Sequence, residues 1–389
     1  MISVAEAFAI LDNLSDPKRT VELPLLEARN HILAETVHSS INMPPFRQAT
    51  MDGFAIALQD SLQYEIVGEV KAGDFYTKEL KPGQALKIYT GAAVPNSTQA
   101  VIQIEKVKIV DSDLFLLETI KPETNVRQLG AQITRDAIAF EEGTFLNPAA
   151  IGFLTGLGFT KVSVYQKPLV GIVVTGNELI SAGENLPDGK VYESNAIMLQ
   201  TALFNANFNT VSLYKVNDDF ENTKTALEKA IKENDVVLVS GGISVGDYDL
   251  VGKALESLNV ETLFYKVNQK PGKPLFVGKQ DDKLIFALPG NPAASLVCFY
   301  IYVLPTLQNR SGKDFRYGSG LKKNLSHDFD VDNPRSQFLK ATVSGNEVTV
   351  LSHQDSGMLD SFALANALIY VHEGKYQLVR EDKVSVYLI

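Results

Sequence analysis

The residues best suited to chemistry lie between Ser240 and Asp249, in the stretch Ser-Gly-Gly-Ile-Ser-Val-Gly-Asp-Tyr-Asp. They follow the apolar run 235–239, which predicts a buried parallel strand, and they precede apolar residues at helical spacing. Glycines on such a turn allow backbone N–H groups at the positive end of a helix to approach an anion. The carboxylates of Asp247 and Asp249 would repel that anion unless a divalent cation lies between them. The pattern fits a phosphate held with a metal ion, but a glycine turn with a solvated acidic edge explains it equally well.

Three further loops carry polar or cationic residues. Thr175-Gly-Asn-Glu178 and Leu288-Pro-Gly-Asn-Pro292 each follow a predicted strand, and ligands of open α/β sheets bind at the carboxyl ends of strands. Between them in the sequence lies Lys270-Pro-Gly-Lys-Pro274, whose lysines on a stiff frame suit a compact oxyanion. Each loop alone is more often an ordinary turn, but four on one rim weaken that explanation. Neither a Walker A motif nor a dinucleotide fingerprint is present.

Regular strand–helix alternation between Pro168 and Gln308 predicts the sheet that positions these loops. Such alternation requires parallel strands with helices on both faces. Strands are expected at 169–174, 211–216, 235–239, 262–267, 275–277 and 284–287, and helices at 194–206, 218–233, after the glycine turn, and at 291–308.

The rest of the chain has a different residue pattern. Short β-type runs separated by Gly, Pro and Asp turns predict strands at 64–70, 85–89, 100–110 and 114–120, with a hairpin turn at 111–113. Helices are expected from a Ser3–Glu6 capping box, at about 24–34, and at 149–157. We predict an α/β multidomain protein with four parts: an N-terminal helical linker domain (1–43 plus 133–166), an inserted β-rich domain (44–132), a central parallel α/β domain (167–312) and a β-barrel-like C-terminal domain (313–389).

Composition limits the possible functions. A net charge of −10 over 389 residues argues against a nucleic-acid partner bound through its phosphates. The only cysteine, Cys298, excludes an internal disulfide framework and a cysteine-based zinc cluster. The most apolar run, 293–304, is too short to span a bilayer, and the N-terminus lacks the basic region of a signal peptide. We therefore expect a cytoplasmic protein without a membrane partner.

Motifs that span the chain resemble the MoeA family, the molybdopterin molybdenumtransferases, which are related to the E domain of gephyrin. The matching stretches are Met51-Asp-Gly-Phe-Ala55 after Pro44-Pro-Phe, Thr90-Gly-Ala92, Thr175-Gly-Asn-Glu178, Ser240–Asp249, Lys270-Pro-Gly-Lys-Pro274, Leu288-Pro-Gly-Asn-Pro292 and Gln354-Asp-Ser-Gly357. Their order along the chain makes a chance match very improbable.

The resemblance implies a molybdopterin-binding type of α/β domain and an enzyme of molybdenum cofactor biosynthesis. Such an enzyme inserts molybdate into adenylylated molybdopterin and releases AMP, and it uses Mg²⁺. It works as a homodimer whose active site combines the α/β domain of one subunit with the small β domain of the other. A molybdopterin adenylyltransferase and molybdoenzyme acceptors are its implied partners.

By motif match, the resemblance also implies residue roles. The acidic catalytic residues would be Asp249, Glu178, Asp218 and, from the partner subunit, Asp52, with Asp249 and Glu178 holding Mg²⁺. Substrate phosphates and the pterin would be bound by Thr175, Ser240, Gly241, Gly242, Ser244, Gly246, Pro289, Gly290, Asn291 and Pro292. Molybdate would be held by Lys270, Lys273, Arg335 and Ser356, and Thr90 and Arg127 would reach across from the partner.

Several positions depart from the family pattern. They are Gln99 and Gln132 in place of acidic residues, Asp355 in place of a glycine, Pro334 in place of the glycine before the arginine, and Lys340 in place of an arginine. An amide oxygen binds a cation more weakly than a carboxylate does, and Asp355 would repel molybdate if it pointed inward. Divergence within an active family is the favoured interpretation. The alternative is a catalytically degenerate protein of the same fold that binds molybdopterin or molybdate or acts as a scaffold.

Overall fold

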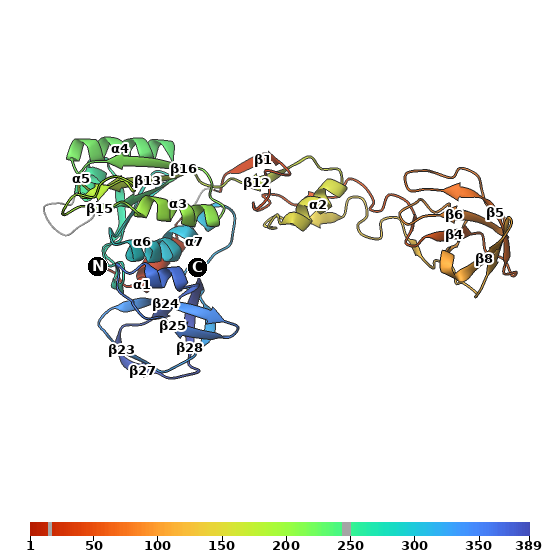
Figure 1. Cartoon of the computed structure of the whole chain (residues 1–389). Helices are drawn as coiled ribbons and strands as arrows, with labels where there is room; N and C mark the ends of the chain where they lie inside the picture. The colour runs from red at the N-terminus through yellow and green to blue at the C-terminus, as the bar shows by residue number, and fades with distance from the viewer. Residues whose placement is uncertain (15–17, 243–249) are drawn as a thin grey trace. The chain divides into compact units, whose positions relative to one another are not determined.

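The computed structural model of the chain describes residues 1–14, 18–242 and 250–389. It divides into two compact units, which Figure 1 draws in one view. One unit comprises residues 1–21, 30–32 and 165–389, and the other comprises 22–29 and 33–164. No helix of the described chain has the length and apolar character needed to cross a membrane.

The first unit is built on a six-stranded sheet with the order β16-β13-β17-β21-β20-β18. The first four strands are parallel, as predicted, but β20 and β18 are antiparallel to their neighbours. The reason is local, because only Asp281 and Asp282 separate β20 from β21, and a two-residue hairpin joins only antiparallel strands. The bounds are β13 Val170–Thr175, β16 Val211–Val216, β17 Val236–Ser240, β18 Glu261–Tyr265, β20 Phe276–Gln280 and β21 Lys283–Leu288.

Helices cover both faces of this sheet, as Figure 1 shows. Alternate residues of β13 point to opposite faces, so Ile172 packs in a core with α1, α3 and α6, whereas Val173 packs in a second core with α4 and α5. Ser3 caps α1 through the predicted capping box. The bounds are α1 Val4–Asp12, α3 Asn195–Asn205, α4 Phe220–Glu233, α5 Leu250–Ser257, α6 Pro292–Cys298 and α7 Leu304–Arg310.

A π-helical turn, Phe299–Val303, joins α6 to α7 and makes the predicted long helix continuous but irregular. Pro305 at the start of α7 has no N–H, and its ring would collide with the carbonyl of Ile301 in a regular α-helix. The wider turn avoids this collision and places Tyr302, fully buried, on the core side.

The C-terminal region of this unit forms a closed five-stranded barrel in the order β24-β25-β22-β28-β26, with β26 pairing back to β24. This confirms the predicted barrel-like region. A short strand from the α/β region, β19 (Gln269–Lys270), adds to β24 in parallel. The other bounds are β22 Leu321–Leu325, β24 Ser336–Ser344, β25 Glu347–Val350, α8 Asp360–Leu364, β26 Ala367–Val371 and β28 Lys383–Leu388, beside a separate ribbon of β23 Phe329–Asn333 and β27 Gly374–Leu378.

The second unit contains a six-stranded sheet in the order β7-β4-β6-β5-β9-β8. The predicted hairpin at Asp111 is present, but the predicted strand 100–110 is interrupted by a 3₁₀ turn, Ile104–Lys106. The interruption is needed because β7 and β8 lie at opposite ends of the strand order. The bounds are β4 Gly53–Ile56, β5 Gln63–Val70, β6 Gln84–Ile88, β7 Ala100–Gln103, β8 Val107–Val110 and β9 Asp113–Leu116.

The predicted helix at 24–34 is wrong. The segment begins with the end of β1 (Thr20–Pro24), continues through a single turn closed by the carbonyl of Pro24, and stops at Asn30, whose φ is +61°. A left-handed residue ends a helix, so this turn cannot propagate. The remaining elements are β14 Leu179–Ile180 and β15 Val191–Tyr192, which pair with each other in the first unit, and β2 Val37–His38, β3 Gln48–Ala49, β10 Val126–Arg127, β11 Ile138–Phe140, β12 Lys161–Tyr165 and α2 Pro148–Gly156, the last close to its predicted range.

Candidate active site

Three predicted loops meet at the carboxyl edge of the sheet, as the sequence indicated. β13, β17 and β21 are adjacent parallel strands, and Val174, Ser240 and Leu288 are aligned across them. The segments that follow, from Thr175, Gly241 and Pro289, therefore leave the sheet side by side. This is the edge where open α/β sheets bind ligands.

Two glycines allow the loop after β17 to pass close to the loop after β13. Gly241 and Gly242 have φ values of +94° and +64°. A Cβ atom on Gly241 would lie 2.2 Å from the carbonyl oxygen of Thr175, and one on Gly242 would lie 2.6 Å from Val251 Cγ2. Only glycine fits both the space and the backbone conformation. The rest of the motif, including Ser244, Gly246, Asp247 and Asp249, lies outside the described residues.

The side chain of Asp218 shapes the loop after β13. Its carboxylate accepts hydrogen bonds from the Thr175 hydroxyl and, at 3.1 Å, from the backbone N–H of Asn177. The Asp218 N–H donates in return to Asn177 Oδ1, also at 3.1 Å. Neither Asp218 nor Thr175 is among the described residues that line the cavity above this edge.

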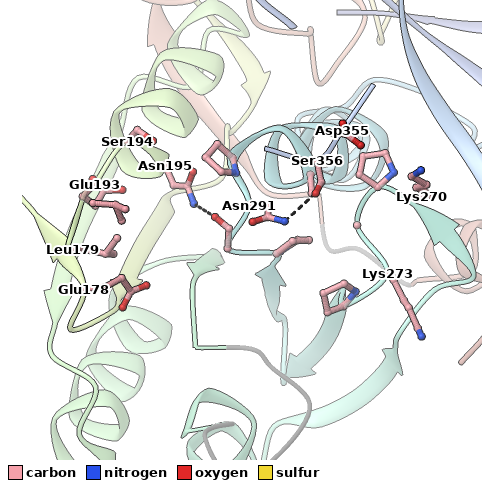
Figure 2. A pocket seen from close by; sticks show the side chains of 18 of the residues that line it. Glu178, Leu179, Glu193, Ser194, Asn195, Lys270, Lys273, Asn291, Asp355 and Ser356 are labelled. Carbon is pink, nitrogen blue, oxygen red and sulfur yellow. Dashed lines mark hydrogen bonds between the residues drawn. The ribbon is translucent and has the colours of Figure 1, made fainter. Parts of the chain in front are cut away.

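That cavity has a volume of about 830 Å³ and lies between the α/β sheet and the barrel. Its two sides differ in charge, and Figure 2 shows Glu178 and Glu193 on one side and Lys270 and Lys273 on the other. The lining includes most of the predicted rim residues together with others: Glu178, Glu193, Asn195, Lys270, Lys273, Pro289, Gly290, Asn291, Pro292, Arg335, Asp355 and Ser356.

The cationic side is assembled by the pairing of β19 with β24. Gln269 aligns with Ser336 and Lys270 with Gln337, so Lys270 lies beside the strand that begins directly after Arg335. The turn that carries Ser356 meets the loop after β21, because Asn291 Nδ2 donates to Ser356 Oγ at 2.9 Å. The structure thus brings the predicted molybdate residues around one cavity, together with the carboxylate of Asp355.

Lys340 supports this cavity from behind. Its side chain is only 3% exposed, and Nζ donates to the carbonyl oxygens of His353, at 2.5 Å, and Met358, at 2.9 Å. A longer contact of 3.4 Å reaches the carbonyl of Asp355, within the same turn. Burial lowers the pKa of the Lys340 ammonium. Because all three partners are carbonyl oxygens, a compact ammonium can hold this turn.

Asn195 and Glu193 belong to the site but were not predicted. Asn195 Nδ2 donates to the carbonyl of Gly290 at 2.9 Å, the dashed line beside Asn195 in Figure 2. It also donates to Ser240 Oγ at 2.8 Å, and so ties together the loops after β17 and β21. Glu193 accepts from the N–H of Ala196, at 2.8 Å, at the start of α3. The sequence signal was Glu-Ser-Asn at the start of a predicted helix on the same edge of the sheet.

The predicted partner-subunit residues lie together within the second unit. Asp52 Oδ1 accepts from the N–H of Thr90 at 2.8 Å and from its hydroxyl at 2.7 Å. Arg127 contacts Gln48 Oε1 at 3.5 Å, and Gln48 Nε2 donates to the carbonyl of Gly91 at 3.3 Å. Arg127 on β10 is thus joined through Gln48 on β3 to Gly91, the residue after Thr90, and Thr90 bonds to Asp52.

Gln99 has a structural explanation in the same unit. Its Oε1 accepts from the N–H of Leu58 at 2.8 Å, while its Nε2 donates to the carbonyl of Ser97 at 3.1 Å. A carboxylate could make only the first of these bonds. The amide at this position therefore satisfies two backbone groups that a carboxylate could not satisfy together.

We predict that Thr90→Val raises the pKa of Asp52 toward its ordinary value. The two donors of Thr90 stabilise the charged carboxylate, first through the backbone N–H and then through the hydroxyl, and so lower the pKa of Asp52. Valine removes the hydroxyl donor and leaves the N–H. A carbonyl-carbon NMR titration of the Asp52 side chain measures the shift, and Thr90→Ser, which keeps the hydroxyl, should leave the pKa unchanged. Equal pKa values in both variants would contradict this explanation.

Comparison with known proteins covers nearly the whole chain. Three family models match in order: the MoeA N-terminal region (domain I and II) at residues 2–158, a probable molybdopterin binding domain at 171–309, and the MoeA C-terminal region (domain IV) at 322–389. Molybdopterin molybdenumtransferase of Staphylococcus epidermidis is 32% identical over 96% of this chain and 92% of its own length. The enzyme of the same name from Staphylococcus aureus is 29% identical over the same shares.

A solved structure agrees with these relatives. The crystal structure of a molybdopterin biosynthesis MoeA protein from Pyrococcus horikoshii superposes with a TM-score of 0.83 at 29% identity, covering 100% of this chain and 99% of that one. The fold, the order of the domains and the sequence thus agree along the whole length, and the chain belongs to the MoeA family of molybdopterin molybdenumtransferases.

Proposed function

We propose that this protein completes the molybdenum cofactor by inserting molybdate into adenylylated molybdopterin, with release of AMP. The observation that carries the proposal is the division of charge within one cavity at the carboxyl edge of the sheet. Glu178 and Glu193 line one side, Lys270 and Lys273 line the other near Asp355, and Arg335 also lines the cavity. The cation that accompanies a nucleotide phosphate needs the carboxylates. The tetrahedral molybdate dianion needs the cationic groups.

The described residues would perform separate tasks in this reaction. The ammonium groups of Lys270 and Lys273, with the guanidinium of Arg335, would hold molybdate through charge-assisted hydrogen bonds. Ser356, oriented by Asn291, would donate its hydroxyl to a molybdate oxygen. The loops from Gly241 and Pro289, joined by the hydrogen bonds of Asn195, would fix the substrate next to that oxyanion. The protein would then promote the insertion by positioning its two reactants. The dithiolene sulfurs belong to the substrate, so the chain needs no nucleophile of its own.

A magnesium ion fits the acidic side of the cavity. Glu178 lines it and offers the carboxylate oxygen that Mg²⁺ prefers, and Asp249, outside the described residues, is the second proposed ligand. Within the described chain, no cluster of three or more His, Cys, Asp and Glu side chains could supply a complete site by itself. Substrate phosphates would therefore share the ion, as is usual for Mg²⁺. The ion would spread the charge that develops when the pyrophosphate bond breaks.

The deciding experiment is AMP release from adenylylated molybdopterin with Mg²⁺, measured with and without molybdate by chromatography. The proposal predicts molybdate-dependent AMP release and one molybdenum retained per pterin product. Tight binding of the pterin nucleotide without AMP release would overturn the proposal and identify a degenerate carrier. In that case Gln132 and Asp355 would be the first positions to restore to the family's residues.

We also propose a homodimer in which Asp52, Thr90 and Arg127 of one subunit complete the site of the other, as the family resemblance implies. This makes a sharp prediction for mixed dimers. Asp52→Asn and Lys273→Ala chains should each be inactive alone, but co-refolded mixtures should recover about one quarter of the normal turnover. Half of the dimers are then mixed, and each mixed dimer has one site free of both substitutions.

The mixing experiment contains its own control. Two differently tagged copies of the Lys273→Ala chain, refolded together, form mixed dimers with no intact site and should stay inactive. Purified mixed dimers of the two different variants that lack turnover would show that Asp52 and Lys273 act within one chain.

A further inference from the structure

The loop that carries Lys270 and Lys273 rests on side chains that the reaction does not use. Gly272, between the two lysines, has a φ of +89°, and a Cβ there would lie 2.6 Å from Cys298 Sγ and 2.8 Å from Gln269 Nε2. The loop backbone is therefore in direct contact with a buried layer beneath it. Cys298 fills part of that layer as a small apolar group, and its burial raises the pKa of the thiol.

Gln269 provides the polar part of this layer. Its side chain is completely buried, and its Nε2 donates to the carbonyl oxygens of Pro271, at 3.1 Å, and Gly272, at 3.2 Å. Both carbonyls belong to the short segment between the two lysines. The amide thus holds the loop at its centre, where the backbone has no strand partner.

Tyr302 holds Gln269 in turn. Its hydroxyl donates to Gln269 Oε1, so both ends of the amide are hydrogen-bonded and its rotamer is fixed. Tyr302 is itself fully buried on the π-helical turn and does not line the cavity. A regular helix through this position would point the phenol in another direction, so the irregular turn caused by Pro305 places this donor.

We propose that Gln269 and Tyr302 are positioning residues that hold Lys270 and Lys273 in the geometry that binds molybdate. The inference rests on the proposed function for the identity of the anion, but the anchoring itself can be measured without any ligand. Loosening the loop would let the ammonium groups move away from the anion, and displacements of about 1 Å are enough to reduce rates strongly.

Tyr302→Phe is the most direct test, because it removes one oxygen and keeps the ring. The variant should raise the KM for molybdate about tenfold, the usual effect of one lost buried hydrogen bond. The KM for adenylylated molybdopterin and the kcat at saturating molybdate should change less than about twofold. Hydrogen exchange of the segment 266–275, followed by mass spectrometry without ligand, should become faster.

Tyr317→Phe is the matched control. Tyr317 is also a buried tyrosine, and its hydroxyl donates to the carbonyl oxygen of Tyr302 at 2.9 Å and bonds to Thr306. The substitution removes a comparable buried hydroxyl from the same neighbourhood, one that bonds to Tyr302 and Thr306 of the helix rather than to Gln269. It should leave the KM for molybdate and the exchange of 266–275 unchanged, so a difference between the two variants reports on positioning rather than on general stability.

A second variant, Gln269→Met, keeps the volume and removes both polar ends. It should shift the molybdate KM at least as far as Tyr302→Phe, and the double variant should add nothing further, because both act through one amide. Unchanged exchange and unchanged molybdate KM in both single variants would overturn the inference. If the unaltered chain itself fails to bind molybdate by calorimetry, the proposed oxyanion site is wrong, and the exchange data alone then decide whether Gln269 and Tyr302 anchor the loop.

Discussion

Replacing Lys273 by alanine is expected to reduce molybdate-dependent turnover by about 10²–10³-fold, the usual cost of losing a charged donor in a desolvated site. Lys273 lines the cationic side of the cavity. Its backbone carbonyl accepts from the N–H groups of Val267 and Leu275, both at 3.0 Å. The substitution leaves these bonds intact, so the loop and the fold should persist while the anion loses a ligand.

The kinetic pattern separates this role from a general one. The loss should appear mainly in the dependence on molybdate concentration, with binding of the pterin nucleotide and the melting temperature unchanged. Lys279→Ala is a suitable control, because Lys279 lies on β20 outside the cavity and pairs with Glu261 at 3.3 Å. Normal turnover in Lys273→Ala would remove this residue from the oxyanion site.

Gly241→Ala is expected to damage both the fold and the activity. The φ of +94° would cost an alanine about 1–2 kcal/mol, and its Cβ would also have to displace the Thr175 carbonyl 2.2 Å away. Because this carbonyl belongs to β13, an interior strand that is paired on both sides, neither backbone can yield easily. We expect a total loss of about 3 kcal/mol or more in the free energy of unfolding, measured by urea titration, and turnover near background.

Gly290→Ala serves as the stability control on the same rim. Its built Cβ meets no described heavy atom within 4 Å, and its φ lies outside the left-handed region. Its unfolding free energy should stay within about 0.5 kcal/mol of the unaltered protein, whatever the effect on substrate binding. Similar unfolding midpoints for Gly241→Ala and Gly290→Ala would show that the loop after β17 can move away from Thr175.

The loops at the carboxyl edge of the sheet could be predicted from the sequence, because each of them shows the same local pattern. Each loop follows a short apolar run and contains Gly or Pro, as in the segments after Val174 and Leu288. A parallel sheet then leaves only one edge on which such loops can meet. The alignment of β13, β17 and β21 confirms this prediction.

Two predictions, a helix after Pro24 and parallel strands at 262–267 and 275–277, were wrong because local residue patterns do not fix the path of the chain. Apolar spacing after Pro24 suggested a helix, but Asn30 in the left-handed region allows only one turn. Strand runs at 262–267 and 275–277 were assigned to a parallel sheet, yet the tight turn at Asp281 and Asp282 makes this edge antiparallel. Periodicity carries no information about strand direction, so only the loop length could have corrected the second error.

The supporting residues could not be predicted, because their contacts are distant in sequence. Lys340 meets the turn around Ser356 from a neighbouring strand, and Tyr302 reaches Gln269 from a helix 33 residues away. In the sequence Lys340 is only a departure from the family pattern, and the structure places it behind the cavity. Sequence patterns identify groups that face a ligand more readily than the buried groups that orient them.

The pairing of β19 with β24 also limits how such a chain can be divided and recombined. Residues 269–270 belong by position to the α/β region, yet within the described chain their strand partner is β24 of the barrel. A fragment that ends before Leu321 would lose that partner together with Arg335 and Ser356. The lysine loop and the barrel must therefore be inherited as one unit. A chimaera that exchanges the barrel between relatives would need to exchange the loop with it, even though 50 residues separate Lys270 from Leu321, where the barrel begins.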